Sequence, residues 1–538
     1  MNAARLLSHL PPRAARPGTR WSGGDSALSR SLSSQDKHMT VADAVSGKEK
    51  MAGVCWLLVG RETEQLLRQT FCMLLGDAAR LGPCHLRRVR FKPGHKLTAY
   101  YDVCVQGHGT RPVAAIWRGH RSAGWRKVKD QIDTIQAEAA ARGLLAPFRA
   151  LAAESREWNL RVQVAPLDLD FPQLVRVFDR RYFTEKLRNA LDGNGEVSGG
   201  STARCSEVNF VRYQPGLRHV LRYELESEGG NASVFAKLSP PDQSVRAFQA
   251  SRHASEWLAA HPTSVTCARP LAFAAADSVI LYPQVVGLPL SEHLRRPSRD
   301  LMSRLRQAGE ALNLLHCLPK SLTLGLELQN LTGEIKEITQ ASEFVQVLLP
   351  EVGATIHSLL DCARSLHEHF PQGPPTFTHG DLKVEHLFVT ESGFTLIDFD
   401  TCRLGDPALD VGTFLADLRV CYSIYNLAGV EEAQKQFLKG YSSNAPDERL
   451  VRARLYEAVE LVKMTVRRVQ LFDDHWASQT EKLVSIARLV MERLQEKLGL
   501  RAKRSSSNKV VHLSPSFADS GARNDPRCRA RRGRARNS

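Results

Sequence analysis

The sequence predicts an α+β chain with more than one domain, in which strand-rich segments precede a long helical region. Three observations predict this order. Residues 204–238 hold three apolar runs of strand length that are separated by turn residues. Residues 291–499 carry apolar side chains at intervals of three and four, the period of amphipathic helices. Residues 89–96 match residues 211–218 position for position, which indicates a repeated hairpin.

The length and the charge of the chain fit several domains between two basic ends. A chain of 538 residues is long enough for more than one hydrophobic core. The formal net charge is +16, of which residues 1–35 contribute +4 and residues 501–538 contribute +9, leaving +3 for the middle. The basic tail is predicted to be disordered. Nucleic acid is not expected as a partner except through this tail.

The location of the protein is predicted from its first residues and from what the sequence lacks. Residues 1–50 contain many Arg and Ser, as organelle transit peptides do, but prolines interrupt any long helix. No apolar run approaches the roughly twenty residues of a membrane span. The eleven cysteines include no C-x-x-C pair, which fits reduced thiols. We therefore expect a cytoplasmic protein, with organelle import as the alternative.

Two aspartates in the C-terminal half follow apolar strands, seventeen positions apart. Asp381 stands in His-Gly-Asp-Leu-Lys-Val-Glu-His, where the catalytic loop of protein kinases has its base. Asp398 follows the apolar residues 394–397, as the magnesium-binding aspartate of kinases follows its strand. Phosphoryl transfer needs positioning, cations on the phosphate and a carboxylate for the hydroxyl proton. We therefore expect Asp381 to orient or deprotonate an acceptor hydroxyl and Asp398 to bind a metal.

These residues resemble the aminoglycoside phosphotransferase and choline kinase family, which has a protein-kinase-like fold. The family carries His-Gly-Asp, then Ile-Asp-(Trp or Phe)-(Asp or Glu), then Gly-Asp-Pro with a further Asp. This chain has the three motifs in the same order at residues 379–381, 397–400 and 405–410. The resemblance implies a bilobal domain with a β-rich N-lobe and a helical C-lobe. It also implies ATP and Mg²⁺ as cofactors and a hydroxylated small molecule as the acceptor.

One position departs from the family motif. Five residues after Asp381, where the family has a metal-binding Asn, this chain has His386. Imidazole is a better ligand for transition metals than for Mg²⁺, so Mn²⁺ is an alternative metal. Asp400 is a further candidate metal ligand. Lys383 either contacts the transferred phosphate or is a solvated loop residue, and His379 is a candidate catalytic residue or a residue that fixes the loop.

The strand-like runs of residues 204–238 are predicted to form the nucleotide side of the site. Lys237, in the third run, is expected to pair with the α- and β-phosphates, under a turn at Gly216 that lies over the nucleotide. Glu256, on the following helix, is the nearest acidic candidate to pair with Lys237. Residues 278–287 are predicted as the last strand of the lobe and its hinge.

The repeated hairpin predicts a duplicated N-lobe in the first half of the chain. Its third strand offers Arg118 near the position of Lys237, and no His-Gly-Asp segment follows, so no second active centre is expected. Convergent turn chemistry around Pro-Gly is the alternative explanation. The predicted segments are a disordered or targeting N-terminus (1–50), an appended α+β domain (51–190), a linker (191–203), the N-lobe (204–290), the C-lobe (291–499) and a disordered tail (500–538).

The predicted function is ATP-dependent phosphoryl transfer to a hydroxyl of a sugar, polyol or amino alcohol. The near-neutral or basic folded region offers no acidic cradle for a polycationic antibiotic. The alternative is a nucleotide-binding pseudokinase or scaffold, because His386 and the spacing of Glu256 depart from the family pattern.

Overall fold

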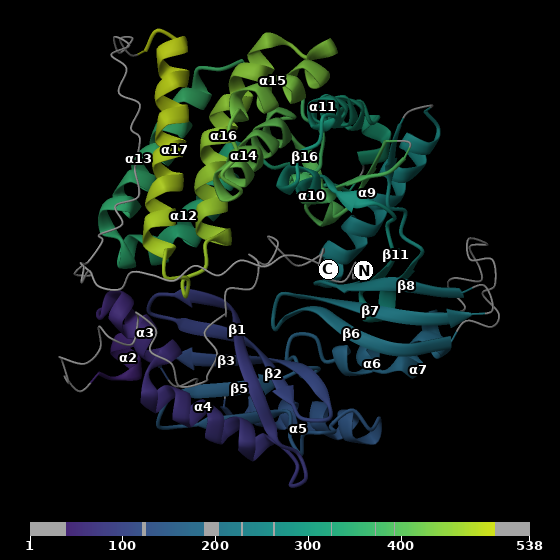
Figure 1. The fold of residues 1–538 in the computed structure, drawn as a ribbon, viewed down its shortest axis with the longest axis vertical. Helices are drawn as coiled ribbons and strands as arrows, with labels where there is room; N and C mark the ends of the chain where they lie inside the picture. The colour runs from purple at the N-terminus through teal and green to yellow at the C-terminus, as the bar shows by residue number, and fades with distance from the viewer. Residues whose placement is uncertain are drawn as a thin grey trace, which may run out of the picture.

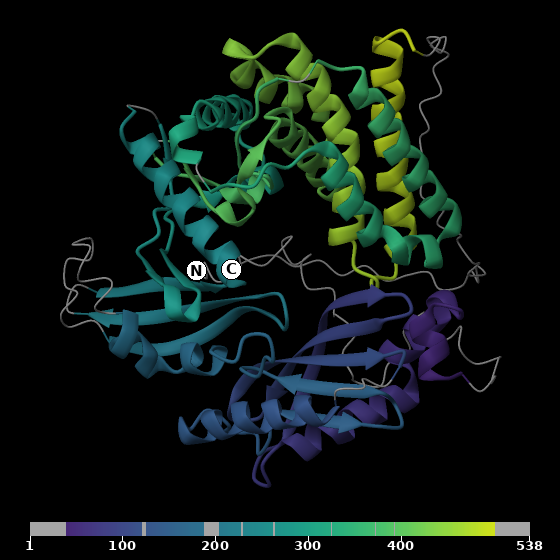
Figure 2. The same ribbon diagram turned by 180° about the vertical axis from the view of Figure 1, so that it is seen from behind.

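The computed structural model describes residues 39–120, 125–187, 204–227, 230–261, 264–323, 325–371, 373–391 and 393–500. Figure 1 and the reverse view in Figure 2 show three parts: a sheet from the first third of the chain, a second sheet beside it, and a helical part above both. The predicted linker, nearly all of the predicted tail and most of the predicted N-terminal segment lie outside the described residues. The predictions for those segments therefore stay predictions.

The first part is an antiparallel five-stranded sheet with flanking helices, in the strand order β1-β2-β3-β5-β4. Its elements are α2 (Val41–Ser46), α3 (Lys50–Val59), α4 (Arg61–Leu74), β1 (Leu81–Lys92), β2 (Lys96–Val105), β3 (Gly109–Arg118), α5 (Trp125–Ala141), β4 (Ala152–Ser155) and β5 (Leu160–Val164). The chain continues through α6 (Leu174–Phe178), α7 (Arg180–Tyr182) and η2 (Phe183–Leu187), which pack against the second sheet.

Helix α2 corrects one sequence prediction, because it lies within the segment predicted to be disordered or targeting. The side chain of Thr40 caps the helix by accepting a hydrogen bond from the N–H of Asp43. The apolar face of α2 is buried against the rest of the first part through Val41, Ala44 and Val45. The cap and the burial of this face stabilise α2, although the sequence that precedes it has the composition of a disordered or targeting segment.

The second part is another antiparallel five-stranded sheet, in the order β10-β11-β8-β7-β6. Its elements are β6 (Arg204–Gln214), β7 (Arg218–Ser227), β8 (Gly230–Leu238), α9 (Pro241–Ala259), β10 (Ala272–Ala274), η3 (Ala275–Asp277) and β11 (Val279–Pro283). The strands fall where the sequence predicts the N-lobe and its hinge strand.

The two sheets have the same topology. Each begins with a three-stranded meander that is followed by a helix, and the fifth strand along the chain then inserts beside the third strand. The hairpin register also agrees, since Lys92 pairs with Lys96 and Gln214 pairs with Arg218. The agreement supports a repeat, whereas descent by duplication stays a hypothesis.

The paired register also identifies the residue of the first sheet that corresponds to Lys237. Lys237 lies opposite Val220, and the equivalent pair in the first sheet is Thr98 with Ile116. The expected counterpart, Arg118, lies two residues further along the strand. The first sheet therefore has a nearly buried isoleucine at the position of the lysine.

The third part is mainly helical. Its elements are β9 (Val265–Cys267), β12 (Leu288–Pro289), α10 (Leu290–Arg295), α11 (Leu301–His316), η4 (Lys320–Thr323), α12 (Leu331–Leu348), α13 (Pro350–Glu368), β13 (Thr376–Thr378), η5 (Val384–His386), β14 (Leu387–Val389), β15 (Phe394–Leu396), η6 (Phe399–Thr401), β16 (Arg403–Gly405), α14 (Ala408–Ile424), α15 (Val430–Tyr441), η7 (Ser442–Asn444), α16 (Asp447–Arg468) and α17 (Trp476–Lys497). The short strands carry the loops of the candidate site.

The first sheet packs against both other parts. One hydrophobic cluster runs without interruption from α2 to α17, and Gly47 lies against Val347 of α12 so closely that a Cβ would collide with it. A second cluster joins Tyr100 of the first sheet to Tyr213 of the second. The predicted domain bounds stay predictions, because the core is shared across them.

Two findings concern the environment of the protein. Within the described ranges, no helix combines the length and the apolar character that a bilayer crossing requires. None of the ten cysteines in those ranges forms a disulfide, and five of them are buried.

Candidate active site

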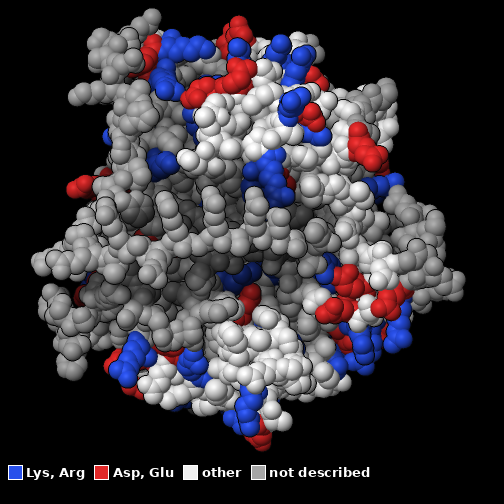
Figure 3. Space-filling model, viewed as in Figure 1, with Lys and Arg blue, Asp and Glu red and all other residues white. Residues whose placement is uncertain are grey.

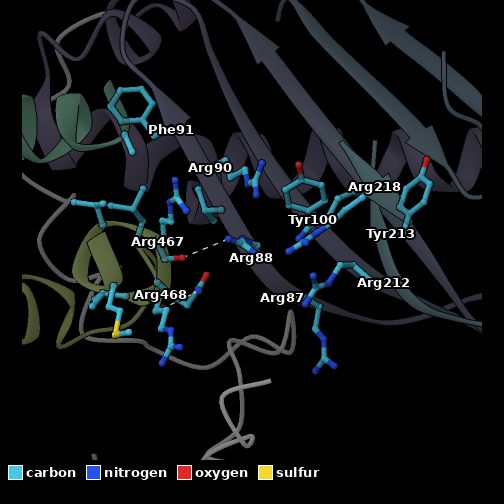
Figure 4. Close-up of a pocket in the computed structure, with 18 of the residues that line it drawn as sticks. Arg87, Arg88, Arg90, Phe91, Tyr100, Arg212, Tyr213, Arg218, Arg467 and Arg468 are labelled. Carbon is cyan, nitrogen blue, oxygen red and sulfur yellow. Dashed lines mark hydrogen bonds between the residues drawn. The ribbon is translucent and has the colours of Figure 1, made fainter. Parts of the chain in front are cut away.

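Two cavities meet in the middle of the molecule. The larger has a volume of about 1200 Å³ and lies between β1, β6, the loop of Asp381 and helix α16. The smaller, of about 280 Å³, lies between the second sheet, the segment 284–287 that follows β11, and the loop of Asp398. Figure 4 shows the larger cavity. Both cavities are lined by Arg212, Arg218 and Asp398, so they are continuous at the predicted reaction centre.

Asp410, at the start of α14, fixes the loop before Asp381. The two carboxylate oxygens of Asp410 accept hydrogen bonds from the N–H groups of His379 and Gly380, each at 2.7 Å. Burial opposes ionisation of Asp410, but hydrogen bonding to His316 holds its pKa below the usual value. Gly380 has a φ of +77°, and a Cβ there would collide with the carbonyl oxygen of Thr401. Asp410 therefore braces this loop.

His379 does not face either cavity. Its side chain is fully buried, and its Nε2 donates a hydrogen bond to the carbonyl oxygen of Ile397 at 3.0 Å. This contact ties the loop of Asp381 to the loop of Asp398. The inclusion of His379 among the catalytic candidates was therefore wrong, and the alternative, that it fixes the loop, agrees with the geometry.

Asp381 reaches the larger cavity together with Lys383. The ammonium of Lys383 lies 2.5 Å from Oδ2 of Asp381. Burial would raise the pKa of Asp381, but the charge of Lys383 holds it well below the usual value. Because such a carboxylate is a weak proton acceptor at neutral pH, its geometry favours orientation of a hydroxyl over early proton removal. Lys383 is not a solvated loop residue, since it is largely buried beside this carboxylate.

Asp398 lies where the two cavities join, with a φ of +70° that is uncommon for a residue with a side chain. Its Oδ1 lies 2.5 Å from the ammonium of Lys237, which also contacts Oδ1 of Asp400 at 2.9 Å. Burial would raise the pKa of Asp398, but the charge of Lys237 holds it well below the usual value. The structure thus brings together the three predicted residues Lys237, Asp398 and Asp400.

His386 faces the other oxygen of Asp398, with 3.5 Å between Nε2 and Oδ2. Its Nδ1 lies 2.9 Å from the carbonyl oxygen of Asp381, which can only accept, so Nδ1 carries the proton and Nε2 has a free lone pair. Burial lowers the pKa of His386, which keeps the ring neutral near pH 7. A lone pair beside a carboxylate is a suitable pair of ligands for one divalent cation. No group of three or more metal-ligating side chains occurs in the described part of the chain.

Glu256 does not pair with Lys237, so this prediction was wrong. Its side chain is about half exposed and lies 3.6 Å from Arg252 on the same helix. On the buried side of α9, the hydroxyl of Ser251 lies 3.0 Å from that of Tyr282. The Tyr282 ring lies 5.5 Å from the Lys237 ammonium. The helix thus turns a hydroxyl toward the lysine side of the site, and Glu256 toward solvent.

The turn at Gly216 is held by the first part of the molecule. The N–H of Gly216 donates a hydrogen bond to Oδ2 of Asp168 at 2.9 Å, and the same oxygen lies 2.7 Å from Nε2 of His219. A Cβ at Gly216 would lie 2.7 Å from Oδ2 of Asp170. Gly216 has a φ of +73°, which a residue with a side chain rarely adopts. That this turn lies over a nucleotide stays a prediction, and the buried carboxylate of Asp168 holds the turn through Gly216 and His219.

Sequence reasoning missed two charged clusters on α16. Lys463 is buried at the back of the larger cavity, between Glu334 and Glu460, and lies 3.0 Å from the latter. Arg468 lies 2.6 Å from Asp417, whose other oxygen accepts a hydrogen bond from a backbone N–H of the loop after Asp381. The available signal was the presence of charged residues within the apolar stripe of a helix, which is rare without a partner.

Residues 215–453 match the model of the phosphotransferase enzyme family. No curated protein matches the chain. Similar solved structures include the GDP and kanamycin complex of APH(2")-IIia, with 15% identity over 58% of this chain and 98% of that chain and a TM-score of 0.38.

Two further solved structures are similar at the same level. A choline/ethanolamine kinase family protein from Mesorhizobium loti is 16% identical over 52% of this chain and 88% of that chain, with a TM-score of 0.37. The amicoumacin kinase hAmiN, in complex with AMP-PNP, Ca²⁺ and Ami, is 15% identical over 53% of this chain and 88% of that chain, with a TM-score of 0.38. The family match begins at the turn of the second sheet and includes all three acidic motifs. The match of residues 215–453 to the model of the phosphotransferase enzyme family confirms the resemblance that the motifs predicted.

Proposed function

We propose that the protein transfers the γ-phosphoryl group of ATP to a hydroxyl of a small molecule of the sugar, polyol or amino alcohol class. The observation that carries this proposal is the junction of the two cavities at Asp398. The smaller cavity contains Lys237 and an apolar hinge side that suits a nucleotide, and the larger contains Asp381. A phosphoryl group can pass only where its donor and acceptor meet, and the junction supplies that place.

Three residues, Lys237, Asp381 and Lys383, would have separate roles in the transfer. Lys237 would turn from its carboxylate partners toward the phosphate oxygens of ATP. Asp381 would orient the acceptor hydroxyl and take its proton while the acceptor oxygen bonds to the γ-phosphorus and the bond from that phosphorus to the leaving ADP breaks. Lys383, beside Asp381, would offset the negative charge on the transferred group.

The residues around Asp398 fit a divalent cation. Asp398 and the free lone pair of His386 would hold the cation, with Asp400 nearby, and phosphate oxygens and water would complete its coordination. The cation, Mg²⁺ or Mn²⁺, supplies positive charge that neutralises the phosphate oxygens. Cytoplasmic location agrees with the free cysteines and stays part of the proposal.

The proposal is tested by measuring ADP release from ATP in the presence of sugars, polyols, amino alcohols and aminoglycosides. Wild type, Asp381→Asn and Asp398→Ala are compared side by side. We expect acceptor-dependent ADP release by wild type, a loss of about 10²–10⁴ in kcat for Asp381→Asn, and no activity for Asp398→Ala. Equal turnover by wild type and Asp381→Asn would contradict the assignment of this residue.

A nucleotide-binding scaffold is the second candidate, and one observation favours it. Glu256 lies away from Lys237, so the lysine is held by Asp398 and Asp400 instead of a helix carboxylate. A thermal-shift titration with ATP and either Mg²⁺ or Mn²⁺ separates the candidates. A rise in melting temperature without any acceptor-dependent ADP release would favour the scaffold. No rise with either metal would contradict nucleotide binding altogether.

A further inference from the structure

The wall of the larger cavity that the first sheet contributes is strongly basic. Strand β1 alternates between the core and the cavity near its end, so that Val89 and Phe91 are buried while Arg88 and Arg90 face the cavity. Figure 4 shows these two arginines next to each other, with Arg467 of α16 on one side and further side chains of both sheets on the other.

The cavity as a whole has an excess of positive charge. Its lining includes eleven Lys and Arg side chains and six Asp and Glu side chains, two of which are Asp381 and Asp398 of the reaction centre. On the described part of the face in Figure 3, by contrast, Lys and Arg are interspersed with Asp and Glu. The cavity lining is therefore more basic than that face.

Arg88 and Arg90 have no acidic partner among the described residues. The side chain of Arg88 donates one hydrogen bond, to the carbonyl oxygen of Arg467 at 3.4 Å. Burial and, after it, the charges of the neighbouring guanidinium groups lower the pKa of Arg88 to about 10. Burial also lowers the pKa of Arg90. By contrast, Arg87 on the same strand is paired with Asp102 at 3.0 Å.

Two half-buried guanidinium groups side by side without a carboxylate cost free energy. An anion between them offsets this cost, and the planar fork of arginine matches the oxygens of a phosphate. A phosphoryl-transfer site has two sources of a phosphate, the nucleotide and the acceptor. The nucleotide phosphates are already accounted for at Lys237 in the smaller cavity, whereas the two arginines line only the larger cavity, which also holds Asp381.

We propose that the acceptor is a small molecule that already carries a phosphate group, and that Arg88 and Arg90 of the first sheet bind this group. The proposal rests on the proposed function and adds the acceptor class to it. A hydroxyl of the bound acceptor forms the new O–P bond at Asp381, ADP leaves, and the product carries two phosphate groups. The first sheet thus recognises the acceptor, while the second sheet holds the nucleotide.

The first measurement compares phosphorylated acceptors with their unphosphorylated forms. Glucose 6-phosphate and glycerol 3-phosphate are assayed against glucose and glycerol by ADP release. We expect wild type to show a KM at least tenfold lower for the phosphorylated member of each pair. Equal KM values within each pair would overturn the proposal.

The second measurement uses variants of β1. The double variant Arg88→Gln/Arg90→Gln is expected to raise the KM for the phosphorylated acceptors at least tenfold, with the KM for ATP unchanged within twofold. Arg87→Gln, on the same strand but paired with Asp102, is the matched control and is expected to change neither KM by more than twofold. An equal rise in both KM values, or an equal effect of the control, would overturn the proposal.

Direct binding separates this proposal from the proposed function. Calorimetric titration of wild type with glucose 6-phosphate, glycerol 3-phosphate and inorganic phosphate needs no turnover. Binding by wild type that is lost in the double variant, with no ADP release from any acceptor, would support the anion site and contradict the proposed phosphotransferase activity. Turnover of neutral acceptors without binding of any of the three probes would support the activity and contradict the anion site.

A folding defect is separated from a lost contact by Arg88→Lys/Arg90→Lys. This variant keeps both charges but loses the two-pronged guanidinium contact. We expect it to melt within a few degrees of wild type and to bind the phosphate probes more weakly than wild type but more tightly than the glutamine variant. Unchanged probe binding in both double variants would overturn the proposal.

Discussion

The two five-stranded sheets share strand order and hairpin register but present different charges to the two cavities. In the second sheet, Lys237 is matched by two carboxylates at 2.5 and 2.9 Å. In the first sheet, the equivalent position is Ile116, and Arg88 and Arg90 on the edge strand β1 have no carboxylate partner among the described residues. The comparison teaches that one scaffold yields different sites according to which strand faces the reaction centre.

The largest effect is expected from exchanging the lysine of the second sheet. Lys237→Met would remove the charge that holds Asp398 and Asp400, so we expect kcat/KM for ATP to fall by about 10²–10³. Ile116→Met, at the equivalent position of the first sheet, is the control and should change kcat/KM less than twofold. Steady-state kinetics on both variants check this. A comparable loss in Ile116→Met would break the asymmetry between the sheets.

A smaller effect is expected where the first part of the molecule fixes the turn of the second sheet. Asp168→Asn would weaken charge-assisted hydrogen bonds to Gly216 and His219, which should lower the free energy of unfolding by about 1.5–3 kcal/mol. The KM for ATP should rise as well if the turn covers the nucleotide. Urea unfolding and kinetics measure the two effects.

The exposed neighbour Asp170 provides the matched control for this experiment. Asp170→Asn leaves the hydrogen bonds of Gly216 and His219 intact, so the urea midpoint should stay within error of wild type. If both substitutions lower the midpoint equally, the buried carboxylate has no special role in fixing the turn.

The second sheet, unlike the first, is followed along the chain by a loop that Asp410 braces. The stability that this contact contributes to the folded protein should be lost at low pH. The pKa of Asp410 is lower in the folded protein than in the unfolded chain. Its contribution is therefore complete above the unfolded value of about 4 and is lost as the pH falls through the folded value. Asp410→Asn should be less stable than wild type by about 1–3 kcal/mol from pH 8 to pH 5.

The difference between Asp410→Asn and wild type should then shrink below about pH 4. Unfolding by urea at a series of pH values measures it. Asp361→Asn, at a carboxylate that is 68% exposed, serves as the control and should match wild type throughout. A stability difference that grows on acidification would contradict the assignment.

The smallest effect is expected at the end of the third strand of the first sheet. Arg118 lines neither cavity, so Arg118→Ala should change the KM for ATP and for any acceptor less than twofold. A tenfold rise in the KM for ATP would mean that the first sheet has a nucleotide site of its own, and the comparison between the sheets would have to be redrawn.

The centre of the candidate site could be predicted from the sequence because its parts are local. Asp381 and Asp398 each follow a short strand at a fixed separation, and the residues of each motif determine the geometry of its loop. Lys237 was found through its place in a strand order. Residue type and spacing were sufficient in these cases, since the backbone alone determines where such side chains project.

The remaining features depend on packing, which the sequence does not display. Glu256 was misassigned because the rotation of α9 about its axis decides which side chain is turned inward, and Ser251, which contacts Tyr282, is buried while Glu256 is exposed. The role of His379 follows from its burial behind the loop. The basic wall joins Arg88 to Asp381 across nearly three hundred residues, and no local pattern links such distant positions.

The packing of Gly47 against Val347 has a practical consequence for anyone who trims this protein. A shortened chain that starts at residue 204 would keep every residue of the phosphoryl-transfer centre. It would, however, expose the apolar side of α12 and of the second sheet to water. Such a fragment should aggregate instead of working as a minimal enzyme.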